Sequence, residues 1–109
     1  MGLVNGGSVQ GSLVQLWSEH RDAGCPTELT GLRIAGKDAP ALDAEITAWV
    51  SACLGQGFRV DERVERRLAE VSAALAEVEP TLQPEAAHYC ARLNRMVGEV
   101  LVRTRAGAA

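Results

Sequence analysis

The sequence predicts an all-α protein that folds as a compact bundle of about four helices. One short strand near 31–35 is an additional element that the pattern allows. Apolar residues recur at spacings of three and four over long segments, which places them on one face of a helix. Pro and Gly residues separate these segments. Aromatic residues make up only 4% of the chain, so we expect a core built from aliphatic side chains and alanine.

The first predicted helix covers residues 8–23. Its apolar face consists of Leu13, Leu16, Trp17 and His20. Gly24 and the nearby Pro26 give the expected stop, because glycine ends helices and proline cannot continue them.

The segment between residues 25 and 37 has the least regular pattern. Leu32 and Ile34 alternate with Arg33, as in a short strand,. Such a strand needs a partner, which the segment Leu3–Val4 or a second copy of the chain could supply. The favoured alternative is an apolar loop that lies over the bundle.

The second predicted helix covers residues 40–54 and opens at Asp38–Pro40. Its main face consists of Leu42, Ile46, Trp49, Val50 and Cys53. A second face consists of Ala41, Ala44, Ala48 and Ala52. A helix that is apolar nearly all round is typically buried, so we expect this helix to be the central one.

The third predicted helix covers residues 61–79, with Asp61 as its cap and Pro80 as its stop. A single seam runs along it: Val64, Leu68, Val71, Leu75 and Val78. One narrow seam predicts an outer helix with a solvated far side.

The fourth predicted helix covers residues 84–104, and Pro84 suits its first turn. A wide apolar face consists of Ala86, Tyr89, Cys90, Leu93, Met96, Val97, Val100 and Leu101. Beside it runs a second stripe: Ala87, Ala91, Gly98 and Val102. Small residues at such spacing let another helix approach closely, so we predict an interface there.

A chain of 109 residues is expected to form one domain,. We assign residues 8–105 to this helical domain, 1–7 to a flexible N-terminus and 106–109 to a flexible tail. The domain is large enough to form a core without a disulfide or a metal.

The overall composition and net charge limit the kinds of partner that we expect. The net charge of −3 disfavours nucleic acid and anionic membranes, and no apolar run approaches the length of a membrane span,. Three cysteines without a signal-peptide pattern predict reduced thiols in a cytoplasm. Ten of the eleven basic residues are arginine and alanine is abundant, which is typical of a GC-rich bacterial gene.

Two groups of residues are candidate sites. Trp17, His20, Trp49 and Tyr89 could line a pocket between helices, against the alternative that they pack in the core. Arg92 and Arg95 could bind an anion, against the alternative of a solvated face.

Chemical motifs are lacking. The sequence has no CxxC or HxxxH spacing, so we predict neither a metal nor another cofactor,. No catalytic residue is predicted either, because Asp43 and Glu45 are two positions apart and diverge on a helix.

The sequence therefore predicts a small non-enzymatic interaction module, an accessory or regulatory protein. It would act by homodimerisation or by docking on a larger protein. The alternative is a small-molecule-binding protein or small enzyme that uses the pocket near Trp17, Trp49 and Tyr89. Nucleic-acid binding through the arginines of the fourth helix is a third and weaker hypothesis.

Overall fold

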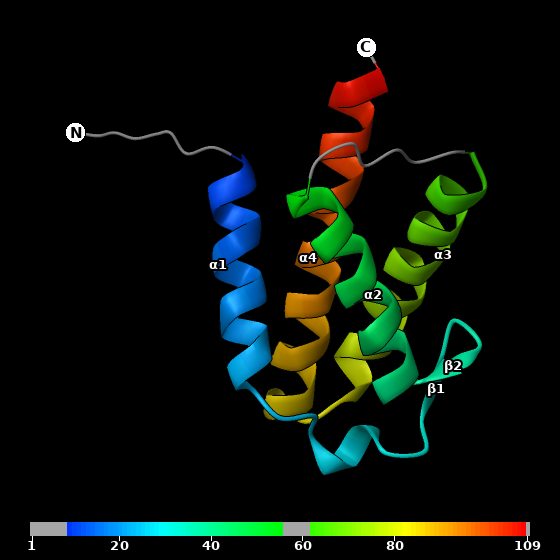
Figure 1. Cartoon of the computed structure of the whole chain (residues 1–109). Coiled ribbons are helices and arrows are strands. Elements are labelled where there is room, and N and C mark those ends of the chain that lie inside the picture. Colours follow the sequence, from blue (N-terminus) through cyan, green and yellow to red (C-terminus); the bar gives the residue numbers. More distant parts are fainter. Residues whose placement is uncertain (1–8, 56–61, 109) are drawn as a thin grey trace.

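The computed structural model describes residues 9–55 and 62–108. Its four α-helices are α1 (Val9–Asp22), α2 (Ala39–Leu54), α3 (Glu62–Val78) and α4 (Pro84–Ala108). Two short 3-10 turns, Thr27–Leu29 and Glu79–Thr81, lie in the connections. The predicted all-α bundle of four helices is confirmed (Figure 1).

The helix at the centre is α4, which packs against α1, α2 and α3 (Figure 1). The expectation that the second helix is central is wrong, because α2 leaves Ala41, Ala44 and Ala48 exposed. Alanine loses little by remaining in water, whereas the larger side chains around α4 gain by burial. Over residues 84–103 of α4, where burial is described, seven residues are buried: Ala86, Tyr89, Cys90, Leu93, Met96, Val97 and Val100.

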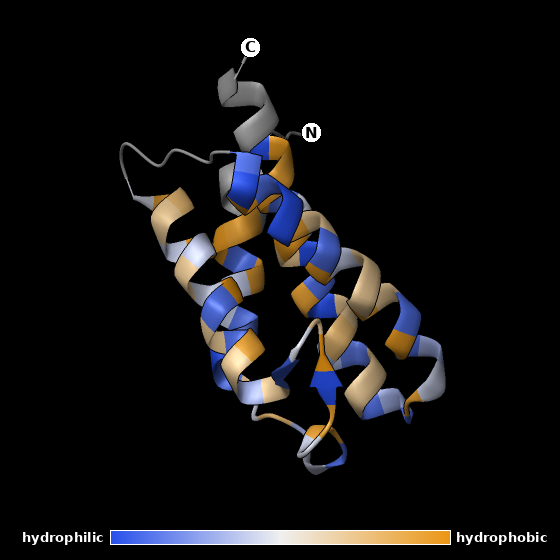
Figure 2. Cartoon of the chain, turned by 90° about the vertical axis from the view of Figure 1, so that its right-hand side faces the viewer, coloured by the Kyte–Doolittle hydropathy of each residue, from blue (hydrophilic) through white to orange (hydrophobic). Residues whose placement is uncertain are grey.

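The core is aliphatic, as the composition predicts. The largest fully buried side chains all belong to leucine, isoleucine, valine or methionine. Hydrophobic and hydrophilic residues alternate along the helices, as amphipathic packing requires (Figure 2),. Within 9–55 and 62–108, no helix combines the length and the apolar character needed to cross a membrane.

The ends of the helices follow local sequence signals. The Asp38 side chain caps α2 by accepting a hydrogen bond from the Ala41 amide at 2.8 Å,. The predicted cap Asp61 and the predicted N-terminus 1–7 lie outside the described residues. The last helix continues past its predicted end at 104 to Ala108, so the predicted tail begins inside it.

The segment before α2 forms a small hairpin. Strand β1 (Arg33–Ile34) pairs antiparallel with β2 (Lys37–Asp38). Ala35 and Gly36 make the turn with φ angles of 54° and 85°, and positive φ at both positions is what a type I′ turn requires,. The strand therefore finds its partner in the next residues of the same chain. The favoured alternative of an apolar loop is therefore wrong for residues 33–38, and the proposed partner Leu3–Val4 lies outside the described residues.

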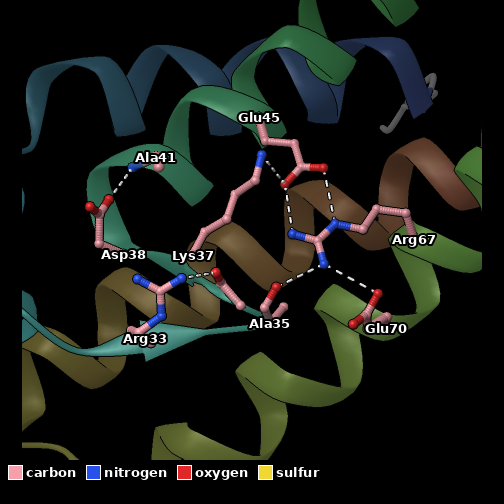
Figure 3. A network of polar contacts seen from close by, with 9 residues as sticks. Arg33, Ala35, Lys37, Asp38, Ala41, Glu45, Arg67 and Glu70 are labelled. Atoms are coloured by element: carbon pink, nitrogen blue, oxygen red, sulfur yellow. Dashed lines mark hydrogen bonds and ion pairs between the residues drawn. The ribbon is translucent and has the colours of Figure 1, made fainter.

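Arg67 of α3 fastens this hairpin to the bundle (Figure 3). Its Nε and Nη2 atoms donate to the Glu45 carboxylate of α2 at 3.0 and 2.9 Å. Its Nη1 atom donates to the carbonyl oxygen of Ala35 at 2.8 Å. Lys37 also pairs with Glu45, at 3.2 Å. These hydrogen bonds, that of Arg67 first, lower the pKa of Glu45.

The turn offers a matched test of backbone strain. A side chain at either Gly36 or Gly24 would meet no atom within 4 Å, but only Gly36 has a positive φ. We expect Gly36→Ala to lower the free energy of unfolding by about 1–2 kcal/mol, because left-handed backbone is strained for other residues. Gly24→Ala should have no such cost. Urea denaturation measures both, and equal effects would contradict the turn geometry.

Candidate functional site

Polar side chains from three helices meet around the carboxylate of Asp43. His20 lies in the last turn of α1, Asp43 and Thr47 lie on α2, and Tyr89 and Arg92 lie on α4. Because each helix contributes at least one of these groups, the cluster forms only when α1, α2 and α4 are packed together.

Asp43 is the shared acceptor of the cluster. Its Oδ2 atom accepts from His20 Nε2 at 2.5 Å and also from the hydroxyl of Tyr89. The Thr47 hydroxyl lies 3.1 Å from Asp43 Oδ1 and 2.7 Å from the Asp43 carbonyl oxygen. One carboxylate thus collects donors from all three helices.

His20 is only 4% exposed and uses both ring nitrogens. Its Nδ1 atom accepts from Arg92 Nε at 3.1 Å. An imidazole that accepts at one nitrogen carries its proton on the other, so Nε2 holds the proton that is shared with Asp43. The His20 and Tyr89 rings also pack together, with centroids 4.8 Å apart.

These contacts shift the pKa values of two groups. Burial alone would raise the pKa of Asp43, but hydrogen bonds from His20 and Tyr89 outweigh it, and the pKa is lowered,. Burial raises the pKa of Tyr89, and the neighbouring Asp43 carboxylate raises it further. At neutral pH Asp43 is therefore ionised, while Tyr89 keeps its proton.

An open cavity of about 350 Å³ borders the cluster. Its walls are formed by His20, Arg21, Ala23, Cys25, Pro40, Asp43, Thr47 and Tyr89. The exposed Cys25 thiol also lines the cavity, but both nitrogens of His20 are already engaged. Because an activated nucleophile needs a base within hydrogen-bond reach, this arrangement is not a Cys–His pair ready for catalysis.

Only two of the four residues predicted to form a pocket line the cavity. His20 and Tyr89 meet at the cavity, whereas Trp17 and Trp49 are partly buried against the core and do not line it. The Arg21 guanidinium lies 5.3 Å from the centre of the Trp17 ring. Sequence reasoning missed Asp43 as a site residue, because a carboxylate near the start of a helix has an ordinary explanation in the helix dipole.

The two arginines predicted to bind an anion have different surroundings. Arg92 is half-buried and donates to His20, and its guanidinium lies 5.8 Å from the centre of the Tyr89 ring. Arg95 is exposed on the outer side of α4. Arg92 therefore belongs to the polar cluster rather than to a solvated basic face.

The small residues predicted to form an interface lie along the edge of α4. Ala87, Ala91 and Gly98 are half-buried, and Val102 is 51% exposed. A Cβ atom at Gly98 would meet no atom within 4 Å. Among the residues that the structure describes, then, no other helix uses the close approach that this glycine permits.

The other thiols belong to the core. Cys53 and Cys90 are buried, and burial raises the pKa of both, that of Cys90 to about 11. Among the described residues, no group of three or more His, Cys, Asp or Glu side chains could hold a metal ion.

Comparisons with known proteins found no match to a protein-family model, a curated protein or a solved structure.

Acid should destabilise the protein partly through Asp43. The pKa of Asp43 is lowered in the folded state, so its stabilising contribution is present above the ordinary pKa of an aspartate and is lost as the pH falls through the folded pKa,. Urea denaturation of the wild type should show a steeper loss of stability below about pH 4 than Asp43→Asn shows. The control is Glu85→Gln, which removes an exposed carboxylate. Parallel profiles for wild type and Asp43→Asn would contradict the assignment.

Tyr89→Phe tests the bond between Tyr89 and Asp43. Loss of a hydrogen bond to this partly buried charge should lower the free energy of unfolding by about 1–3 kcal/mol,. In a double-mutant cycle with Asp43→Asn, the two effects should be less than additive because the residues share one contact. Full additivity would show that the hydroxyl acts elsewhere.

Proposed function

We propose that this protein is a small, non-enzymatic interaction module that homodimerises or docks on a larger protein through one face of α4. This α4 face consists of Ala91, Arg95, Gly98 and Val102. The three free thiols fit a reducing compartment, and we propose a cytoplasmic location,.

The observation that carries this proposal is the open space at Gly98. Glycine within a helix costs roughly 0.5–1 kcal/mol relative to alanine, so a helical glycine is expected to have a packing reason. Apart from the adjoining backbone of α4 itself, the described parts of the chain place no atom within 4 Å of the position a Cβ would occupy. A second helix lying across α4 would use that space, as the sequence pattern predicts.

The surroundings of Gly98 suit such a contact. Because three helices cover α4, its exposed positions form a narrow stripe that includes His88, Arg95 and Val102. Val102 is one of two large hydrophobic residues that the described residues leave well exposed; the other is Val14 of α1. An apolar side chain beside a glycine notch, with a charged residue at its edge, is a common composition for an interface.

The polar cluster supports the non-enzymatic part of the proposal. Catalysis by acid and base needs groups that are free to exchange a proton with a substrate. Here His20 has no free nitrogen, Tyr89 donates its proton to Asp43, and Asp43 holds three donors. The cluster is therefore better suited to hold α1, α2 and α4 together than to catalyse a reaction.

A matched pair of substitutions tests the α4 face. We expect Val102→Asp to abolish self-association, because it places a charge in an apolar contact. Val14→Asp makes the same change at 46% exposure on another helix and should leave association intact. Sedimentation equilibrium at micromolar concentration measures the mass against the 11.6 kDa monomer. A strictly monomeric wild type would rule out the homodimer.

Gly98→Ala separates an interface from simple helix packing. The added methyl group meets no atom in the described bundle, so the monomer should become more stable by about 0.5–1 kcal/mol,. The same methyl group should weaken association if a partner helix lies against Gly98. Higher thermal stability with unchanged association would contradict the proposed contact.

A further inference from the structure

At its Asp43 side, the cavity presents hydrogen-bond acceptors rather than donors. The Tyr89 hydroxyl donates its proton to Asp43, and the Thr47 hydroxyl donates to the carbonyl or the Oδ1 atom of the same residue. Both nitrogens of His20 are engaged. What Tyr89 and Thr47 still offer to the cavity is therefore the lone pairs of their oxygens.

The Asp43 carboxylate retains capacity for one more donor. A carboxylate has about four acceptor positions, and His20, Tyr89 and Thr47 account for three of them,. The Asp43 side chain is 25% exposed and lines the cavity. A negative charge with a free lone pair thus faces a space large enough for a small molecule.

We propose that this cavity binds a small primary ammonium compound, whose nitrogen lies against the Asp43 carboxylate. An ammonium group has three donors and no acceptor. Three oxygens of residues that line the cavity can accept from it: Asp43 Oδ1, Tyr89 Oη and Thr47 Oγ1. Charge-assisted hydrogen bonds of this kind are stronger than neutral ones, which favours the ammonium group over a neutral alcohol.

Arg21 is a candidate contact for a second charged group on the ligand. Arg21 lines the same cavity, and its guanidinium lies over the Trp17 ring. An arginine recognises a carboxylate through paired N–H groups. A ligand that carries both an ammonium and a carboxylate group, as amino acids do, would engage both ends of the site.

Three compounds of equal carbon count form the first test. Propylammonium carries the cation alone, β-alanine carries both charges, and propionate carries the anion alone. Calorimetry and amide NMR shifts should show binding of propylammonium and β-alanine, with shifts at His20, Asp43 and Tyr89, and no binding of propionate. The proposal is overturned if propionate binds, if propylammonium fails to bind at about 10 mM, or if the shifts map elsewhere.

Variants on α2 form the second test. Asp43→Asn removes the charge and should weaken propylammonium binding at least about tenfold. Thr47→Val leaves the carboxylate in place, removes one acceptor and should weaken binding several-fold, which keeps the test informative if Asp43→Asn fails to fold. Glu45→Gln removes a carboxylate that pairs with Arg67 and should leave binding unchanged. Affinity that survives both Asp43→Asn and Thr47→Val would overturn the assignment.

This site is independent of the α4 face. Val102→Asp should leave propylammonium binding at wild-type strength, and Thr47→Val should leave self-association unchanged. If Val102→Asp abolished propylammonium binding in a folded protein, the ligand would lie at the dimer contact and the cavity assignment would be wrong.

Discussion

The burial of α4 is the constraint on which the rest of this structure depends. Large apolar side chains occupy so much of its circumference that one neighbouring helix could not cover them, and each is worth roughly 1.5–3 kcal/mol when fully buried. Three helices therefore pack around it, and the connections between them follow from that arrangement. The hairpin is held on the outside by Arg67, which joins its turn to α2 through Glu45.

Because α1, α2 and α3 pack around α4, the polar groups around Asp43 are only partly accessible to water. A charge in such a place must be compensated, and Asp43 is compensated by donors from α1, α2 and α4 at once,. The same bonds set the position of α1 along its neighbours, because His20 must reach Asp43 and Arg92 together. These bonds also explain what the neighbouring cavity can bind. The hydroxyl protons of Tyr89 and Thr47 are already donated to Asp43, so the free lone pairs of their oxygens remain available as acceptors.

The two proposed binding regions are centred on different parts of α4, although the α4 face begins at Ala91, close to Tyr89. Tyr89 is near the start of the helix and Val102 is near its end, which at 1.5 Å per residue separates them by about 20 Å. The cavity belongs to the end of the bundle where α1 ends and α2 begins. A small molecule and a protein partner could therefore bind at the same time, and each proposal stands without the other.

The sequence by itself determined the four helices and most of their ends, because apolar spacing, Pro80, Pro84 and the Asp38 cap act within a few residues. Only the tertiary structure decided which helix is central, which strand pairs with β1, and where His20 and Asp43 meet. The bonds from Asp43 to His20 and Tyr89 span 23 and 46 positions, and that from His20 to Arg92 spans 72. Helical periodicity tells which residues share a face, but it carries no information about which faces of different helices meet.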